Sequence, residues 1–295
     1  MTKPTGTQAT GTKPTGTQAT GTQAIGSDDG VAGAAAHPRP FTLAVDIGGT
    51  GLKASVLDAT GSMVADRVKV ATTYPMPPEG LVSKLCALVA PLPDAERASV
   101  GFPGMVRTGH VLSAPHFVTV GGPGTDVDSD LERAWSRFDL ATALTEAFGI
   151  PTRVANDADI QGAAAVSGHG LELVVTLGTG FGSSLFYEGQ LLPHLEIAHQ
   201  PFRKGQAYDD QIGEAARKEV GDERWAKRVS KALANMRELC FFDHCYVGGG
   251  NARRLKRDDL PEDVTVIDNT AGILGGIKLW EGAHVGVTEP VAAGS

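Results

Sequence analysis

The sequence predicts an α/β protein built from two related lobes. Apolar segments of strand length alternate with segments of helical spacing along most of the chain. A strand, a glycine-rich turn and a returning strand also occur twice, near residues 41–57 and 173–187. Glycine-rich turns expose backbone N–H groups that can cradle phosphate oxygens. The recurrence therefore indicates two lobes that hold opposite ends of one phosphate chain.

The first glycine-rich turn joins a buried strand over residues 41–45 to a returning strand over residues 52–57. Glycine is expected there because it has no Cβ to block a phosphate and because the turn is expected to need a positive φ. The residues assigned to phosphate binding are Asp46, Gly48, Gly49, Thr50 and Lys53. Asp46 is also expected to hold Mg²⁺ through water, since Mg²⁺ takes oxygen ligands and keeps several waters. A plain tight hairpin with a solvated lysine is the alternative.

The remaining elements follow from apolar periodicity and from the proline and glycine residues at segment ends. In the first lobe they are strands at 63–70, 98–102 and 152–155, helices at 81–89 and 139–148, a mobile glycine-rich loop at 121–124, and a closing helix at 271–281. In the second lobe they are strands at 173–177, 184–187, 243–247 and 264–267, an alanine-rich helix after Asp159, and a helix at 222–240. The helix at 222–240 is expected to bury one apolar stripe, formed by Trp225, Val229, Ala232, Met236 and Leu239.

Composition excludes several classes of protein. The chain has 295 residues, of which 41% are hydrophobic and 20% charged, so it fits one large domain or two lobes. Neither a bilayer-spanning apolar run nor a signal peptide is present, and we expect a cytoplasmic protein without a membrane partner. The net charge of −8 gives no reason to expect nucleic-acid binding. The three cysteines, Cys86, Cys240 and Cys245, lack zinc-site spacing and are expected to be free thiols.

Basic residues concentrate in one segment of this acidic chain. Residues 203–257 contain 13 of the 26 Lys and Arg residues against eight acidic residues, and so carry a net charge of +5. Solvated helix faces are the ordinary interpretation of such a segment. A surface for a polyanion is the alternative.

The N-terminal segment is a low-complexity repeat. Residues 2–11 read TKPTGTQATG, and residues 12–21 repeat that string. Such residues cannot bury a core, so we expect residues 1–40 to be a disordered tail, to which no function is assigned. The predicted domains are a lobe at 41–155, joined by a closing helix at 271–284, a second lobe at 156–270 and a flexible tail at 285–295.

Seven motifs occur in a fixed order between residues 42 and 282. They read DIGGTGLK, GFPGMV, ANDAD, LGTGFGSSL, EIAH, VGGGNARRL and NTAGILGG. In this order they resemble the ROK family of sugar kinases and repressors, and within it most closely the polyphosphate glucokinases and polyphosphate/ATP glucomannokinases. The resemblance implies a two-lobed actin-like ATPase (ribonuclease H-like) fold, with mixed sheets flanked by helices.

The resemblance also implies roles for individual residues. Asp157 would be the general base that accepts a proton from the attacking sugar hydroxyl. The implied sugar-binding residues are Asn156, Asp157, Glu196, His199 and Gly104. The second phosphate loop would be Gly178, Thr179 and Gly180, and the stretch beside a nucleotide would be Gly248, Gly249, Gly250 and Asn251. Simpler interpretations are a helix N-cap for Asn156 and Asp157, a surface pair for Glu196 and His199, and a strand terminator for the last glycines.

The chain departs from the wider family at several positions. No cysteine-rich motif follows His199, so no structural zinc is expected. Ala198 occupies a position where the family has glycine, which leaves the identity of the hexose open. The family's next acidic residue corresponds to Asp209 or Asp210. The N-terminus cannot form the helix-turn-helix of the repressors, and the resemblance favours a homodimer.

The leading hypothesis is a Mg²⁺-dependent kinase that transfers a terminal phosphate to the 6-hydroxyl of glucose or a related hexose. Polyphosphate is the favoured donor, because a linear polyanion would gain from the basic segment at 203–257. ATP remains a possible donor, used together with polyphosphate or by itself. Two further hypotheses are a kinase of another hexose and, from a different class, a catalytically silent sugar-binding sensor.

Overall fold

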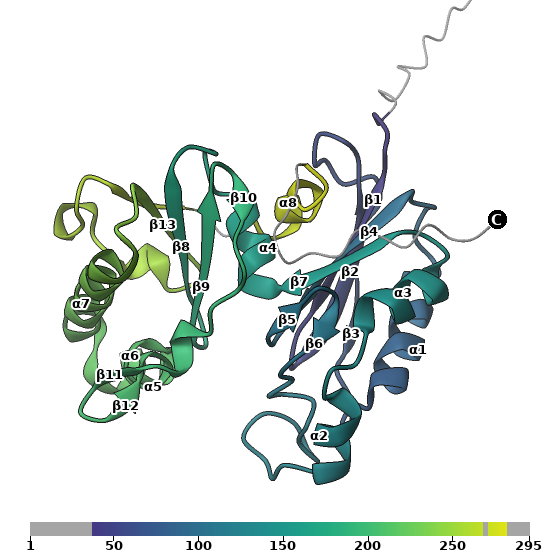
Figure 1. The fold of residues 1–295 in the computed structure, drawn as a ribbon, viewed down its shortest axis with the longest axis horizontal. Helices are drawn as coiled ribbons and strands as arrows, with labels where there is room; N and C mark the ends of the chain where they lie inside the picture. The colour runs from purple at the N-terminus through teal and green to yellow at the C-terminus, as the bar shows by residue number, and fades with distance from the viewer. Residues whose placement is uncertain (1–36, 268–270, 282–295) are drawn as a thin grey trace, which may run out of the picture. The chain divides into compact units, whose positions relative to one another are not determined.

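The computed structural model describes residues 37–267 and 271–281, and these form two five-stranded sheets with the same hydrogen-bonding plan (Figure 1). The first sheet has the order β3-β2-β1-β4-β7 and the second has the order β10-β9-β8-β13-β14. In each sheet an antiparallel hairpin, β1–β2 or β8–β9, continues into two parallel strands. The predicted α/β fold with mixed sheets flanked by helices is confirmed.

The elements have the following bounds. The first sheet contains β1 (Thr42–Ile47), β2 (Gly51–Leu57), β3 (Val68–Ala71), β4 (Arg97–Phe102) and β7 (Thr152–Asn156). The second contains β8 (Leu171–Leu177), β9 (Phe181–Tyr187), β10 (Gln190–Leu191), β13 (His244–Gly248) and β14 (Val264–Val266). The α-helices are α1 (Pro78–Val89), α2 (Ser129–Trp135), α3 (Leu140–Phe148), α4 (Asp157–Ala163), α5 (Tyr208–Ile212), α6 (Glu214–Val220), α7 (Asp222–Cys240) and α8 (Ala271–Lys278). Two small ribbons, β5 (Val106–Arg107) with β6 (His110–Val111) and β11 (Pro201–Arg203) with β12 (Gln206–Ala207), and three 3₁₀ helices (Ile197–His199, Ala252–Arg254 and Arg257–Asp259) complete the described chain.

The first sheet packs one face on a hydrophobic core. Leu43, Val45 and Ile47 alternate along β1 and lie in that core, which α1 and α3 cover. The residues between them, including Ala44 and Asp46, face the other side of the sheet, where they line a cleft. The alternation of side chains along β1 therefore separates the core from the functional face.

The second sheet packs against α7, whose apolar stripe confirms the predicted amphipathic helix. Trp225, Val229, Ala232, Leu233 and Met236 are buried in one core with β8 and β13. Leu239 was predicted to complete this stripe, but it is 63% exposed. It lies in the last turn of α7, one residue before the helix ends at Cys240. The buried stripe of α7 therefore stops at Met236.

Helix α4 contacts strands of both sheets and also α8 (Figure 1). Two glycines let α8 approach closely. A Cβ on Gly275 would overlap the carbonyl oxygen of Ile160 in α4, and one on Gly276 would lie 3.3 Å from the Cβ of Ser99 in β4. This packing holds α4, whose first residue is Asp157, between the two sheets.

Some local predictions were wrong in extent. A third strand was expected over residues 63–70, but Met63 makes only an isolated bridge to Leu57, and β3 begins at Val68. The glycine-rich segment at 121–124 is a turn closed by Thr125, whose Oγ1 accepts a hydrogen bond from the Gly121 N–H at 3.0 Å. The sequence patterns missed α2, α5, α6 and the short ribbons because these elements have two to seven residues, too few for a clear period.

Several predictions concern residues outside the described ranges. The expected tails at 1–40 and 285–295 lie largely or wholly outside them, and the closing helix is described only as far as Glu281. Within the described ranges no helix is long and apolar enough to cross a membrane. Cys86, Cys240 and Cys245 are free thiols, as predicted.

Candidate active site

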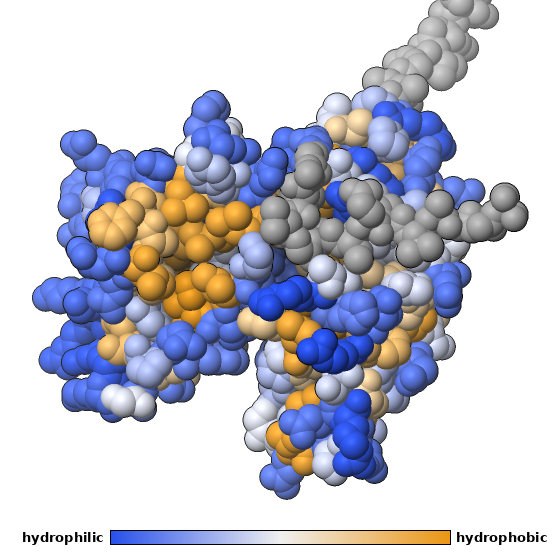
Figure 2. Space-filling model, in the orientation of Figure 1, coloured by the Kyte–Doolittle hydropathy of each residue, from blue (hydrophilic) through white to orange (hydrophobic). Residues whose placement is uncertain are grey.

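A cleft of about 1300 Å³ is lined by both glycine-rich hairpins, by the start of α4 and by the segment around Glu196. The face drawn in Figure 2 is hollowed between the side that carries α7 and the side that carries α2. The predicted site residues that line the cleft are Asp46, Gly48, Gly49, Lys53, Gly104, Asn156, Asp157, Gly178, Thr179, Gly180, Glu196, His199, Gly249 and Gly250. Thr50, Gly248 and Asn251 are not among the lining residues. The volume is ample for a hexose together with a chain of phosphates.

The hairpin between β1 and β2 presents a carboxylate and an ammonium group to the cleft. Lys53 Nζ lies 2.9 Å from Asp46 Oδ2, and both side chains are about half exposed. Thr72 Oγ1 and Tyr74 Oη hold the turn from behind by donating to the carbonyl oxygens of Gly48 and Gly49 at 2.7 and 2.5 Å. The turn is therefore fixed through its carbonyl groups, while its charged side chains remain accessible to a ligand.

The expectation of a positive φ in this first turn was wrong. None of its glycines, Gly48, Gly49 and Gly51, has a positive φ. Close packing explains two of them instead. A Cβ on Gly48 would lie 2.9 Å from the Gly51 carbonyl oxygen, and one on Gly49 would lie 3.2 Å from the ring of His116. Steric room, rather than backbone conformation, is the reason for glycine here.

The hairpin between β8 and β9 is held by backbone groups from several segments. The N–H of Glu214 donates to the carbonyl oxygens of Gly178 and Thr179 at 3.1 Å each. On the other side of the turn, the Phe181 N–H donates to Asp209 Oδ1 at 2.6 Å. Gly249 has a φ of 89°, and a Cβ on it would press against the backbone of Leu177. Glu214, Asp209 and Gly249 therefore all contact the second turn or the end of β8 beside it.

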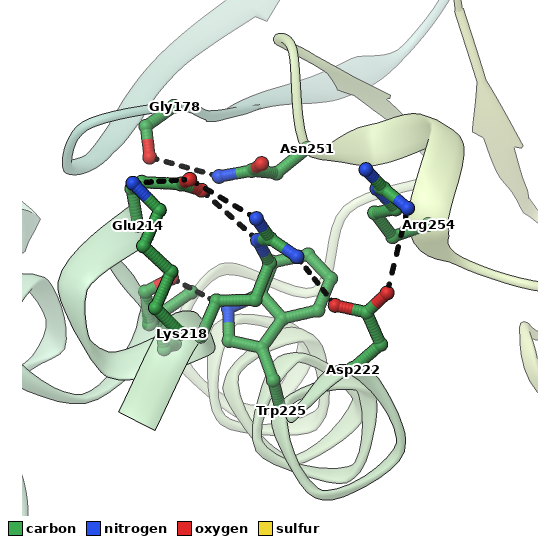
Figure 3. A network of polar contacts seen from close by, with 9 residues as sticks. Gly178, Glu214, Lys218, Asp222, Trp225, Asn251 and Arg254 are labelled. Carbon is green, nitrogen blue, oxygen red and sulfur yellow. Dashed lines mark hydrogen bonds and ion pairs between the residues drawn. The ribbon is translucent and has the colours of Figure 1, made fainter. Parts of the chain in front are cut away.

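A network of charged side chains supports this second turn (Figure 3). Asn251 Nδ2 donates to the Gly178 carbonyl oxygen at 3.1 Å, so the amide faces the turn. Glu214 accepts two hydrogen bonds from Arg217, at 2.9 and 3.0 Å, and Arg217 also contacts Asp222 at 2.5 Å. Arg254 contacts the other Asp222 oxygen at 3.6 Å. These contacts assign Asn251 a supporting position behind the turn.

Asn156 and Asp157 join β7 to α4 at the centre of the cleft. Asn156 is the N-cap of α4, since its Oδ1 accepts from the Ala158 N–H at 2.8 Å. Its Nδ2 donates to the Gly104 carbonyl oxygen at 2.9 Å, which leaves one amide proton for a ligand. A Cβ on Gly104 would overlap the carbonyl oxygen of Ser113. The N-cap interpretation of Asn156 and its place in the cleft are therefore compatible.

Asp157 has the electrostatic character of a base. Burial at the start of α4 raises the pKa of its carboxyl group to about 6, and the negative charges of Asp46 and Asp159 act in the same direction. The backbone N–H of Ala158 and the charge of His194 oppose the shift. A carboxylate with a pKa near 6 is ionised at neutral pH and is a better proton acceptor than an ordinary aspartate.

The segment after β10 brings Glu196, Ala198 and His199 to the cleft wall. The nearby His194 ring is the main cause of a lowered pKa at Glu196, and the charge of His199 adds to this effect, although burial opposes it. Ala198 is 6% exposed, so its methyl group packs against protein as well as facing the cleft.

The structure separates the two candidates for the next acidic residue. Asp209 lines the cleft, and its oxygen accepts the N–H of Phe181. Burial raises the pKa of Asp209, although that hydrogen bond and the charge of His199 lower it. Asp210 instead accepts from the N–H of Ala207 at 3.0 Å, at the start of α5, and does not line the cleft. Asp209 is therefore the acid in position to contact a ligand.

Sequence patterns missed two histidines that line the cleft and one buried acid behind it. His194 lines it and pairs with the buried Asp159, and His116 lines it beside Gly49. Burial lowers the pKa of His116, so its ring is neutral at physiological pH. Asp159 carries a weak signal, since it belongs to the ANDAD motif, whereas neither histidine lies in a pattern that distinguishes it from a core residue.

None of the lysines and arginines of the basic segment at 203–257 lines the cleft. Lys53 and Arg67 are the lysine and arginine that do so, judged over the described residues. Five cations of the segment instead form ion pairs with acidic residues: Arg217, Lys218, Lys227, Arg237 and Arg254. The arrangement agrees with solvated, paired helix faces. The basic segment therefore gives no support for polyphosphate as the donor at the reaction centre.

One carboxylate at the first hairpin fits a Mg²⁺ ion that arrives with a phosphate donor. The described residues contain no group of three or more His, Cys, Asp or Glu side chains that could hold a metal alone. Mg²⁺ at phosphate sites commonly uses one or two protein carboxylates, with phosphate oxygens and waters as its other ligands. Asp46 is half exposed to the cleft and meets that requirement.

Comparison with known proteins gives a consistent result. The model of the ROK family matches residues 42–194. The polyphosphate glucokinase of Mycobacterium tuberculosis is 27% identical over 248 residues, which cover 78% of this chain and 88% of that protein.

Solved structures share the fold over most of the chain. The inorganic polyphosphate/ATP-glucomannokinase from Arthrobacter sp. strain KM has a TM-score of 0.66 and 28% identity, and the match covers 81% of this chain and 97% of that chain. A ROK family glucokinase from Streptomyces griseus, solved with glucose and AMPPNP, has a TM-score of 0.62 over 81% of this chain and 98% of that chain. At 20% identity the second likeness concerns the fold alone, which is the actin-like ATPase fold.

Proposed function

Since this chain belongs to the ROK family and is a sugar kinase, we propose that it transfers the terminal phosphate of polyphosphate to the 6-hydroxyl of glucose or a closely related hexose. The observation that carries the proposal is the position of Asp157. It lies in one cleft with both glycine-rich hairpins and with Glu196, His199 and Asp209, and its raised pKa suits a proton acceptor.

The proposed reaction uses each part of the cleft. The hexose hydroxyl oxygen attacks the terminal phosphorus, the bond from that phosphorus to the bridging oxygen breaks, and the hydroxyl proton passes to the Asp157 carboxylate. Glu196 and Asp209 accept hydrogen bonds from other sugar hydroxyls, while His199 and the remaining amide proton of Asn156 donate. These contacts orient the attacking hydroxyl, which supplies much of the acceleration in phosphoryl transfer.

The donor is placed along the two hairpins. Lys53 and the backbone N–H groups at Gly49, Thr179 and Gly180 offset phosphate charge, while the N–H groups of Gly48 and Gly178 close the two turns by donating to the carbonyl oxygens of Gly51 and Gly180. When bound, Mg²⁺ would neutralise charge on the phosphate oxygens, and Asp46 is the residue that we propose holds it. The roles of Asp46 and Lys53 count against a silent sugar sensor, because binding a sugar alone needs neither group.

Relatives support polyphosphate as the donor, and one feature of the cleft favours ATP as a second candidate. The relative from M. tuberculosis is named a polyphosphate glucokinase, and the Arthrobacter structure is of a polyphosphate/ATP enzyme. Gly249 and Gly250 line the cleft beside the second hairpin, and a Cβ on Gly250 would meet no atom within 4 Å. That open space could receive the nucleoside of ATP.

The test is formation of sugar 6-phosphate from glucose or mannose with Mg²⁺, with polyphosphate and ATP supplied in separate reactions. We expect product with polyphosphate. Product with ATP but not with polyphosphate would show that ATP, and not polyphosphate, is the phosphate donor. Binding of hexose without transfer from either donor would contradict the kinase proposal and favour the sensor.

A further inference from the structure

His194 lies between two carboxylates at the wall of the cleft. Its Nδ1 is 2.9 Å from Asp159 Oδ1, and its Nε2 is 3.9 Å from Glu196 Oε2. The side chains of His194 and Asp159 are each 4% exposed, whereas that of Glu196 is 29% exposed. The chain of contacts therefore runs from a buried acid, through a buried ring, to an acid that faces the ligand.

The two neighbouring carboxylates favour a positively charged ring in this position. Nδ1 is within hydrogen-bond distance of Asp159, and Nε2 faces Glu196 at ion-pair distance, so a proton on each ring nitrogen meets an anionic group. Burial lowers the pKa of His194, but the hydrogen bond with Asp159 and the charges of Asp159 and Glu196 outweigh burial and raise it to about 10. One cation between two anions also limits the repulsion that Asp159 and Glu196 would exert on each other and on Asp157.

The contacts connect the sugar site to the helix that carries the base. Asp159 is the third residue of α4 and Asp157 is the first, so both are fixed to one rigid turn. Glu196 has no comparable anchor, because it lies in a segment outside the strands and its side chain does not cap the following 3₁₀ helix. A carboxylate on an irregular segment needs such an external contact to hold one rotamer.

We propose that His194 is a positioning residue that fixes Glu196 against Asp159 and so holds the hexose in register with Asp157. The proposal rests on the proposed function, since it assumes that Glu196 binds the sugar. His194 itself need not touch the reacting atoms. Its loss should weaken hexose binding much more than donor binding, because the proposed donor contacts come from the two hairpins and Lys53, none of which His194 holds.

The variant His194→Gln tests the proposal with KM measured separately for the hexose and the donor. We expect the hexose KM to rise about tenfold or more and the donor KM to change by less than about threefold. His169→Gln is the matched control, because His169 is exposed, its ring lies 3.5 Å from Ser167 Oγ, and it does not line the cleft. An unchanged hexose KM in an active, folded His194→Gln protein would overturn the proposal.

The double variant Asp159→Asn/His194→Gln separates positioning from stability. Two neutral amides can hydrogen-bond without a buried charge, so this variant should unfold at a temperature close to that of the wild type. We expect its hexose KM to stay high, because no cation faces Glu196. Recovery of the wild-type hexose KM, or failure of both variants to fold, would show that the contacts of His194 serve stability only. Either result would overturn the proposal. Inactivity of the wild-type protein with every hexose and donor would instead count against the proposed function.

Discussion

The two glycine-rich hairpins have the same local pattern but different chemistry. Both join antiparallel strands at the edge of the cleft, and both are followed in their sheets by two parallel strands. The first carries Asp46 and Lys53, which are 51% and 47% exposed. The second has no charged residue between Leu177 and Phe181. The first therefore supplies charge to a ligand, whereas the second supplies backbone groups and the hydroxyl of Thr179.

The neighbours of each turn explain the difference. Two hydroxyl groups, from Thr72 and Tyr74, hold the first turn from behind. The second is enclosed by Asp209, by the N–H of Glu214 and by Asn251, which leaves little room for its atoms to move. A strand–glycine–strand pattern thus predicts the shape of a phosphate loop, whereas its chemical contribution depends on residues far away in the sequence.

The largest effect should come from the residue between the hairpins. Replacing Asp157 by Asn should lower kcat by about 10³-fold or more, because no base then accepts the hydroxyl proton. The same change should raise stability at pH 7. The native pKa of Asp157 lies above the unfolded value, so its ionised form costs stability once the pH exceeds the unfolded pKa, and Asn removes a cost of about 3 kcal/mol. Steady-state kinetics and thermal unfolding measure the two effects.

Two observations would contradict that assignment. One is nearly full activity of the Asp157→Asn protein, and the other is a flat pH profile. Because Asp157 must be ionised, kcat/KM of the wild type should fall about tenfold per pH unit below a pH of about 6. Asp94→Asn is a suitable control, because Asp94 is exposed in a loop and does not line the cleft.

The contrast in charge between the hairpins predicts a metal effect at the first one only. Replacing Asp46 by Asn should lower kcat by about 10- to 100-fold and raise the Mg²⁺ concentration needed for half-maximal activity. Activity is measured across a Mg²⁺ titration at saturating hexose and donor. An Asp46→Asn protein with a wild-type Mg²⁺ titration would remove the proposed metal role and leave Asp46 as the partner of Lys53.

The contrast in enclosure predicts different outcomes for two glycines of the second turn. A Cβ on Gly178 meets no atom within 4 Å, whereas one on Gly180 would lie 2.6 Å from the Asp209 carboxylate. Gly178→Ala should therefore keep its stability and raise the donor KM about tenfold, since the methyl group enters the space proposed for phosphate. Gly180→Ala should lower stability by about 1–3 kcal/mol, because it displaces Asp209 from the N–H of Phe181.

Urea unfolding and donor KM, measured on both alanine variants, check this pair. Equal changes in stability and in donor KM for the two variants would contradict the different surroundings of Gly178 and Gly180 as the cause of the predicted effects. A loss of stability in Gly178→Ala, with the donor KM unchanged, would place the phosphate elsewhere in the cleft.

Local patterns predicted the hairpins, α7 and the position of Asp157 because each depends on residues close together in the sequence. The reason for glycine in the first turn was not predictable, since it depends on the distance from Gly49 to His116. The position of His194 in the site was not predictable either, because it depends on a contact with Asp159, which is 35 residues away in the sequence. The extent of β3 was overestimated because β3 pairs with β2 only from Val68 onward, and the apolar pattern of residues 63–70 contains no information on this pairing.

The smallest effect concerns the support behind the second turn. Asn251 was predicted to lie beside a nucleotide, but it is 9% exposed and its amide donates to the Gly178 carbonyl oxygen. Asn251→Ala should lower the free energy of unfolding by about 1 kcal/mol, because the Gly178 carbonyl oxygen loses one of its two donors and keeps the N–H of Glu214. We expect the ratio of ATP to polyphosphate activity to stay unchanged. Asn235→Ala, which removes a hydrogen bond to the Tyr208 hydroxyl, is the control, because neither residue lines the cleft. A selective loss of ATP activity would instead place Asn251 in contact with a nucleotide, and the second hairpin would then discriminate between donors as well as holding them.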